Sequence, residues 1–150
     1  MKSKFYLLLL APLLILASCK KWNAGNESTY ITGNWELVAV DRYNNYGTEP
    51  VYSEYESGAF YFSNNYQAEY SDSYGRMYGS WNLVQRSEGY YDPHGNWRNG
   101  PVTSLQMQLY DNYQRRVIEW EFYAVEISGN RMIGFMNRFG YEYRYEFRRY

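Results

Sequence analysis

Residues 141–148 alternate strictly between aromatic and charged side chains, and this pattern constrains the fold more than any other feature of the chain. Tyr141, Tyr143, Tyr145 and Phe147 occupy the odd positions, and glutamates and arginines occupy the even positions. Successive side chains of a β-strand point to opposite faces. The pattern therefore predicts a strand with one buried face and one face in water.

The same period of two recurs along the chain. A first strand is expected from Gly33, with Trp35, Leu37 and Ala39 on one side. Six further strands are expected near residues 58–63, 66–72, 77–86, 102–110, 115–126 and 131–137. Their expected inward residues are Phe60, Phe62, Tyr66, Tyr70, Trp81, Leu83, Leu105, Met107, Leu109, Ile118, Trp120 and Phe122. Residues 132–136 are apolar on both faces, so the register of that strand is undecided.

Short turns separate many of these strands, which predicts an antiparallel meander. Residues 63–65, 111–112 and 128–130 are rich in Asn, Asp, Ser and Gly, the residues that tolerate turn geometry. Eight antiparallel strands have to protect their edges, and closure into a barrel does so. We therefore expect an all-β, eight-stranded antiparallel up-and-down barrel, whose interior accommodates side chains or one small ligand.

The N-terminus has the pattern of a secretory signal. Lys2 and Lys4 precede an apolar run over residues 5–17. This run is too short for a membrane-spanning helix, which needs roughly 20 apolar residues. The run ends in Leu-Ala-Ser before Cys19, the chain's single cysteine, and this ending resembles the bacterial lipobox. The resemblance implies that Cys19 becomes the lipid-modified first residue of the mature protein.

The residues after Cys19 bear on location. Lys20 and Lys21 follow it, and no aspartate stands at the position that retains lipoproteins at the inner membrane of enteric bacteria. We expect an outer-membrane lipoprotein whose partner is the membrane, through the lipid anchor. The sequence leaves a periplasmic or a surface orientation open.

Several segments together resemble a family. Gly33-x-Trp35 at the start of the first strand is similar to the motif that opens lipocalins. The lipobox, residues 31–37, 60–65, 79–83 and 118–132, and the final Tyr-Glu-Phe-Arg-Arg strand resemble the lipocalin-like lipoproteins of Bacteroidota. Lipocalins proper usually carry a disulfide and a helix, and neither is evident here.

The resemblance implies a fold and a location, and it implies no substrate. It implies that Gly33 and Trp35 form a barrel-closing motif in which the tryptophan packs against a late arginine, either Arg144, Arg148 or Arg149. It also implies three segments: a signal peptide at 1–18, a lipidated tether at 19–30 and a lipocalin-like β-barrel domain at 31–150.

Two connections are long, and such loops are often functional. Residues 42–56 follow the first strand, where lipocalins place a lid over the barrel mouth. Residues 87–101 join the fourth and fifth strands, and on an up-and-down barrel the two connections lie at opposite ends. The second contains the expected ligand-binding residues Tyr90, Tyr91, His94, Trp97 and Arg98. Exposed Trp and Tyr rings favour stacking on sugars or flat apolar ligands. The alternative is a hairpin whose aromatics lie on the barrel wall.

Composition excludes several function classes. One histidine and one cysteine cannot form a histidine pair or a four-cysteine zinc site, and Asp92 with His94 provides only two metal ligands. Lysine and arginine nearly balance aspartate and glutamate, with no basic block, so a nucleic-acid partner is not expected. The pairs Glu119/Glu121 and Glu142/Glu146 lie opposite the aromatic faces, as a solvated, arginine-neutralised surface. We expect no catalytic residues, no metal and no cofactor.

The leading hypothesis from the sequence is a non-catalytic, lipid-anchored module that binds a small apolar or aromatic ligand, or a glycan. The alternative is a structural or interaction subunit of an outer-membrane complex, with a barrel filled by its own side chains. An enzyme would require Glu119 or Glu142 to be buried beside another carboxylate. The oligomeric state stays open.

Overall fold

The structure is a computed structural model that describes residues 30–44, 47–87, 89–92 and 96–150. The predicted signal peptide, Cys19 and His94 lie outside these residues, as does the tether apart from Tyr30. The described elements are β1 (Gly33–Asn44), β2 (Gly47–Pro50), the 3₁₀ helix η3 (Glu54–Ser57), β3 (Ala59–Phe62), β4 (Gln67–Asp72), β5 (Gly75–Arg86), β6 (Tyr90–Tyr91), β7 (Trp97–Arg98), β8 (Val102–Asp111), β9 (Arg116–Phe122), β10 (Ala124–Ser128), β11 (Arg131–Arg138) and β12 (Tyr141–Arg149). The fold is all-β, as the alternation predicts.

Ten of the strands form one antiparallel sheet, in the order β10-β11-β12-β1-β3-β4-β5-β8-β9 with β2 beside β1. The remaining two, β6 and β7, pair with each other. The sheet contains every predicted strand, but it has ten strands rather than eight. Strand β2 forms inside the first long connection, and the predicted strand at 115–126 is divided into β9 and β10.

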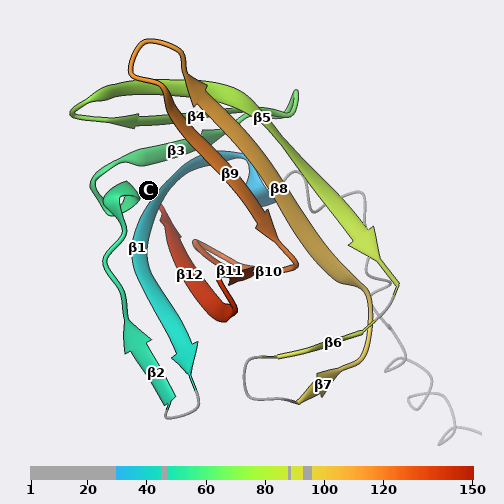
Figure 1. The fold of residues 1–150 in the computed structure, drawn as a ribbon. Coiled ribbons are helices and arrows are strands. Elements are labelled where there is room, and N and C mark those ends of the chain that lie inside the picture. The colour runs from blue at the N-terminus through green and yellow to red at the C-terminus, as the bar shows by residue number, and fades with distance from the viewer. Residues whose placement is uncertain (1–29, 45–46, 88, 93–95) are drawn as a thin grey trace, which may run out of the picture.

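The hydrogen bonding does not close this sheet into a barrel. Its path ends at β9 and β10, which follow one another in the chain and meet at a sharp bend in Figure 1. Phe122 and Val125 both belong to the main core, whereas Tyr123 and Ala124 both face a second cluster. Two successive residues on one face interrupt the alternation and bend the strand. Tyr123 N–H donates to the carbonyl of Phe135, 2.9 Å away, and transfers the pairing to β11.

A bulge also shifts the first strand. The pairing of β1 with β12 changes register between Leu37 and Ala39. The alternation beyond Leu37 moves by one residue, so Val40 rather than Ala39 is buried in the core. The prediction for Ala39 is wrong for this reason, while those for Trp35 and Leu37 are confirmed.

The main core contains most of the predicted inward residues. Those that are buried are Phe60, Phe62, Tyr70, Trp81, Leu105, Met107, Leu109, Ile118, Trp120 and Phe122. Leu83 is only partly buried. The prediction for Tyr66 is wrong: it has a positive φ of 64° before β4 and is exposed, with its ring against Trp81.

The second cluster explains why residues 132–136 are apolar on both faces. Met132 and Met136 face the main core, while Phe135 packs with Val102 and Ala124 outside it. Tyr90, Tyr123 and Ile133 cover this second cluster. The strand is therefore buried from both sides. Among the described residues, no helix has the length and hydropathy needed to cross a membrane.

Candidate functional site

The predicted aromatic connection is a small hairpin separate from the large sheet. Tyr90 pairs with Arg98, and Tyr91 pairs with Trp97, across β6 and β7. The rings of Tyr91 and Trp97 meet edge to face, with 4.9 Å between their centroids. Tyr91 is 65% exposed and Trp97 is 50% exposed. The hairpin therefore holds two aromatic rings together at the surface.

Asp92 fixes the shape of this hairpin. Its side chain is 7% exposed and accepts hydrogen bonds from Arg98 Nε at 2.9 Å and from the backbone N–H of Asn96 at 2.9 Å. The indole N–H of Trp97 donates to Asn99 Oδ1. A Cβ on Gly89 would lie 2.7 Å from the Trp97 ring, so only glycine allows this close approach. Arg98 therefore positions the hairpin through Asp92.

Tyr90 does not share the exposed face of its neighbour. Its ring lies against Tyr123, with 6.1 Å between centroids, in the second cluster. Its hydroxyl donates to Glu126 Oε1 at 2.9 Å. Burial and this hydrogen bond raise the pKa of Tyr90 to about 12. The predicted set is thus divided: Tyr91 and Trp97 lie together at the surface, and Tyr90 anchors the hairpin.

The predicted closing motif brings the two ends of the described chain together. Trp35 is fully buried, and its indole N–H donates to the carbonyl of Ile31 at 2.7 Å. The guanidinium of Arg149 lies over the Trp35 ring. Gly33 has a φ of 118°, a conformation that favours glycine.

Aromatic side chains fill the centre of the core. The ring of Trp120 lies against Phe60, Phe122 and Tyr145, with centroid distances of 5.5, 5.8 and 5.1 Å. Tyr55 adds to this packing from η3. These contacts support a filled interior rather than an enclosed ligand chamber.

Tyr55 reaches the core because η3 begins with a capping box. The backbone N–H of Ser53 donates to Glu56 Oε1 at 3.2 Å, and Ser53 Oγ accepts from the backbone N–H of Tyr55 at 3.4 Å. These two hydrogen bonds fix the first turn of η3. The ring of Tyr55 then lies edge-on to Tyr70 at 5.4 Å and to Trp120 at 5.3 Å. Burial raises the pKa of Tyr55 to about 12. The first long connection therefore places a ring on the core.

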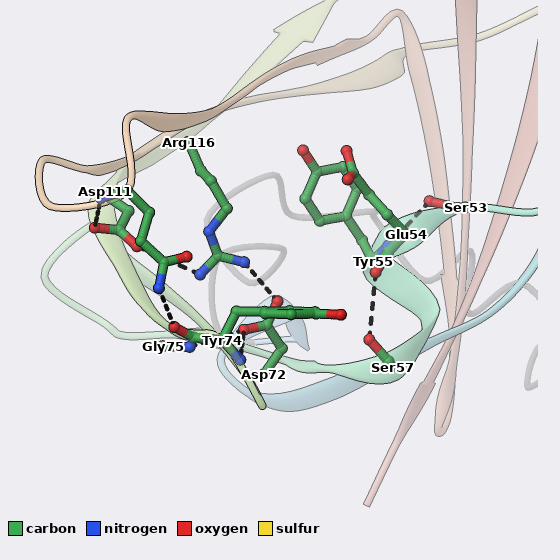
Figure 2. Close-up of polar contacts among 10 residues, drawn as sticks. Ser53, Glu54, Tyr55, Ser57, Asp72, Tyr74, Gly75, Asp111 and Arg116 are labelled. Atoms are coloured by element: carbon green, nitrogen blue, oxygen red, sulfur yellow. Dashed lines mark hydrogen bonds and ion pairs between the residues drawn. The ribbon is translucent and has the colours of Figure 1, made fainter.

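A polar cluster that the sequence analysis did not predict joins two hairpin ends beside η3 (Figure 2). Arg116 donates to Asp72 Oδ2 at 2.6 Å and to Asp111 Oδ2 at 3.4 Å. The other oxygen of each aspartate accepts two backbone N–H groups of its own turn. Gln114 Nε2 also donates to the carbonyl of Tyr74. The cluster locks the β4–β5 and β8–β9 turns together.

The aspartates of this cluster are ionised and buried. Their side chains are 3% exposed for Asp72 and 8% exposed for Asp111. Burial raises the pKa of Asp72, but hydrogen bonds from Arg116 and two backbone N–H groups outweigh it, and the pKa lies below its usual value. The backbone N–H of Gln114 is the main cause of the lowered pKa of Asp111. The sequence signal was present, because each aspartate opens a turn, but their sharing of one arginine depends on the fold.

The two glutamate pairs singled out from the sequence make contacts outside the main core. Glu146 pairs with Arg131 and Arg144, and Glu142 accepts from the hydroxyl of Tyr123. Glu121 accepts from Gln106, and Glu119 accepts from Tyr110. A shallow hollow of about 420 Å³ lies on the outer face of β5, β8 and β9 and is lined by polar side chains that include these two glutamates. Within the described residues, no three potential ligands are grouped to hold a metal ion.

Comparisons of the chain with protein-family models, with curated proteins and with solved structures give no match in any of the three.

Proposed function

We propose that this chain is an outer-membrane lipoprotein whose β domain is a non-catalytic module that binds a glycan on its surface. The observation that carries the proposal is the Tyr91–Trp97 pair, which is exposed and yet held in one arrangement by Asp92 and Arg98. Exposed aromatic rings lose water easily and offer flat faces to the C–H groups of a sugar ring. A preorganised pair binds at a lower entropic cost.

The surroundings favour a glycan over an apolar ligand. Asn96 and Asn99 flank Trp97, and their amides can donate to and accept from sugar hydroxyls. The main core is filled by rings such as Trp120 and Phe122, so an enclosed lipid has little room. The ligand in this proposal therefore lies on the outside of the domain.

In this proposal the domain is a lipocalin-like barrel of eight strands, with β9 and β10 acting as one bent strand that connects β8 to β11. The succession of β9 and β10 in the chain supports this interpretation, as does the stacking of Arg149 on Trp35. Cys19 carries the anchor. Each buried methylene of a lipid chain contributes about 0.8 kcal/mol, so two or more chains hold the module at the membrane durably.

The binding test uses the fluorescence of Trp97. Trp35, Trp81 and Trp120 are buried, so Trp97 is the exposed tryptophan among the described residues, and Trp22→Phe removes the one outside them. The full chain in detergent is titrated with hexasaccharides of glucose, xylose or N-acetylglucosamine, and with laurate and biliverdin as apolar probes. We expect at least one hexasaccharide to protect Trp97 from acrylamide quenching.

Two variants make this test specific. Tyr91→Ala is expected to lower the affinity about tenfold, because it removes one of the two rings. Tyr52→Ala removes an exposed tyrosine elsewhere and is expected to leave the affinity unchanged. Protection by the apolar probes alone, or by none of the probes, contradicts the proposal.

The anchor is tested separately by mass spectrometry of the membrane fraction. We expect cleavage before Cys19 and a mass increase equal to its lipid chains. The Cys19→Ala chain is expected to be neither lipidated nor cleaved at this site. An uncleaved wild-type chain with a free thiol contradicts the lipoprotein assignment.

The filled core favours a second candidate function, that of an interaction subunit of an outer-membrane complex. A domain whose interior is occupied by its own rings has no need of a ligand to complete its packing. Crosslinking in intact cells tests this candidate. A stoichiometric complex that survives in the Trp97→Ala chain, together with no response to any hexasaccharide, supports it over the binding module.

A further inference from the structure

We propose that the joined ends of the β4–β5 and β8–β9 hairpins form a separate binding site for an uncharged oligosaccharide, centred on Tyr74, Tyr78, Tyr110 and Tyr113. This site is independent of the Tyr91–Trp97 hairpin and shares only its class of ligand. An open surface hollow of about 670 Å³ lies here. It is lined by these four tyrosines with Gly75, Arg76, Asp111, Asn112 and Gln114.

The four tyrosines come from two hairpins and line one hollow. Tyr78 on β5 and Tyr110 on β8 are direct cross-strand partners, so both side chains lie on the same face of the sheet, where both are exposed. Tyr74 and Tyr113 lie in the two turns, and Tyr113 is fully exposed. Packing among the described residues leaves these four rings largely exposed. Tyrosine is a favoured contact residue because its ring offers a rigid face and its hydroxyl a hydrogen bond.

The frame beneath the rings is fixed. Arg116 bridges Asp72 and Asp111, and Gln114 donates across the hairpins to the backbone of Tyr74. Figure 2 shows Tyr74 and Arg116 close together in this cluster, and the guanidinium lies 6.0 Å from the Tyr74 ring centroid. Because the two turns cannot separate freely, the rings are arranged before any ligand arrives.

The charges point to an uncharged, hydroxyl-rich ligand. Asp111 is paired with Arg116, and Arg76 is paired with Glu69 at 3.2 Å. The charges that line the hollow are thus balanced within the chain, which gives an ionic ligand no complement. The amide of Asn112, the amide oxygen of Gln114 and the hydroxyls of Tyr74 and Tyr113 offer donors and acceptors beside the rings. An oligosaccharide combines apolar ring faces with hydroxyl edges, and this matches both features.

The two candidate sites are well separated. Strand β8 runs from the β6–β7 hairpin to the turn that carries Tyr113, and Figure 1 shows the two ends of β8 on opposite sides of the molecule. Ten residues of β-strand span roughly 30 Å. A substitution in one site therefore leaves the other intact, and the two proposals can fail independently.

The experiment uses the full chain in detergent with Trp97→Ala, so that the hairpin does not contribute. Saturation-transfer difference NMR and calorimetry measure binding of the glucose, xylose and N-acetylglucosamine hexasaccharides. We expect at least one to bind, and Tyr113→Ser and Tyr74→Ser each to weaken it about tenfold. Tyr113→Phe keeps the ring and is expected to stay within about threefold. Tyr150→Ser removes an exposed tyrosine that does not line the hollow and whose backbone N–H donates to the carbonyl of Asn34; it serves as the matched control and should bind as the parent does.

Three results overturn the proposal. The first is the absence of hexasaccharide binding in the Trp97→Ala chain, whatever the wild-type chain does. The second is unchanged affinity in Tyr113→Ser and Tyr74→Ser. The third is a loss of hexasaccharide affinity in the Tyr150→Ser control that equals the loss in Tyr113→Ser and Tyr74→Ser. If the wild-type chain binds and Trp97→Ala abolishes all binding, the hairpin is the glycan site and the tyrosine hollow is not.

Discussion

The guanidinium of Arg149 lies over the indole of Trp35, with 4.6 Å between its central carbon and the ring centroid. Trp35 and Arg149 are also cross-strand partners of β1 and β12, so the contact joins the first strand to the last. A terminal nitrogen of Arg149 donates to the carbonyl of Tyr30. Of the three arginines that the sequence left open, Arg149 makes this contact. Arg144 instead pairs with Asp41 and Glu146.

We predict that Arg149→Ala lowers the free energy of unfolding by about 1–2 kcal/mol, because it removes a cation–π contact with a fully buried indole. Urea unfolding followed by fluorescence measures this change. Arg148→Ala removes an exposed arginine next in the chain and is expected to change stability by less than about 0.5 kcal/mol. Equal losses of unfolding free energy in the two variants would show that the contact with Trp35 does not stabilise the fold.

The Arg116 cluster gives a larger predicted effect. Arg116→Gln leaves the carboxylates of Asp72 and Asp111 buried without their cation and is expected to cost about 3 kcal/mol of unfolding free energy. Arg76→Gln breaks an exposed pair with Glu69 and a side-chain hydrogen bond with Tyr78, and a much smaller loss of stability is expected. Adding Asp72→Asn to Arg116→Gln should recover part of the loss, since one stranded charge disappears. A loss in Arg116→Gln no greater than that in Arg76→Gln would contradict this account.

The sequence predicts the strands well because a buried face imposes a period of two wherever it exists. It fails where that period is interrupted. The bulge after Leu37 and the bend at Tyr123 occur where neighbouring residues are apolar on both sides, so alternation marks no single register. Tyr90 illustrates the same limit: its ring covers Phe135 outside the core, and only the fold brings β6 against β11.

The candidate sites are predictable to different degrees. The sequence identifies Tyr91 and Trp97 as candidates, because a long connection between strands that is rich in aromatic residues is unusual. The tyrosine hollow is not, because Tyr74 and Tyr113 lie in turns 39 residues apart in the sequence. Their proximity depends on Arg116 bridging two aspartates that each look like ordinary turn residues. Long-range polar contacts of this kind leave no local pattern.

The lowered pKa of Glu146 predicts that the protein loses stability in acid. Hydrogen bonds from Arg131 and Arg144 outweigh burial and lower the pKa of Glu146 to about 2, from 4.5 in the unfolded chain. The unfolded state therefore binds more protons as pH falls below about 5, and stability declines from there towards pH 2. We expect the unfolding free energy to be steady near pH 6–7 and to fall between pH 5 and pH 3, with the lowered pKa values of Asp72 and Asp111 adding to the slope.

Glu146→Gln isolates this contribution. It is expected to lower stability at pH 7 by about 1–2 kcal/mol, since it removes a carboxylate held by two guanidiniums. It should also make stability less dependent on pH between 5 and 3, and Arg131→Gln should do the same to a smaller extent. Urea unfolding at pH 7, 5, 4 and 3 provides the measurement. An unchanged slope in Glu146→Gln would mean that other groups govern the acid response.

A substitution at Gly134 tests how closely β11 packs on the core. A Cβ at this position would lie 2.6 Å from Cδ1 of Phe122, so alanine forces the ring to move. We expect Gly134→Ala to cost about 1–3 kcal/mol, as overpacking of a filled core does. Phe122→Leu is expected to cost a similar amount through lost packing. In the double variant the smaller leucine makes room for the added methyl group, so the combined loss should be less than the sum of the two single losses. Thermal and urea unfolding of the four chains measures this coupling, and strictly additive losses would mean that Gly134 and Phe122 do not compete for the same space.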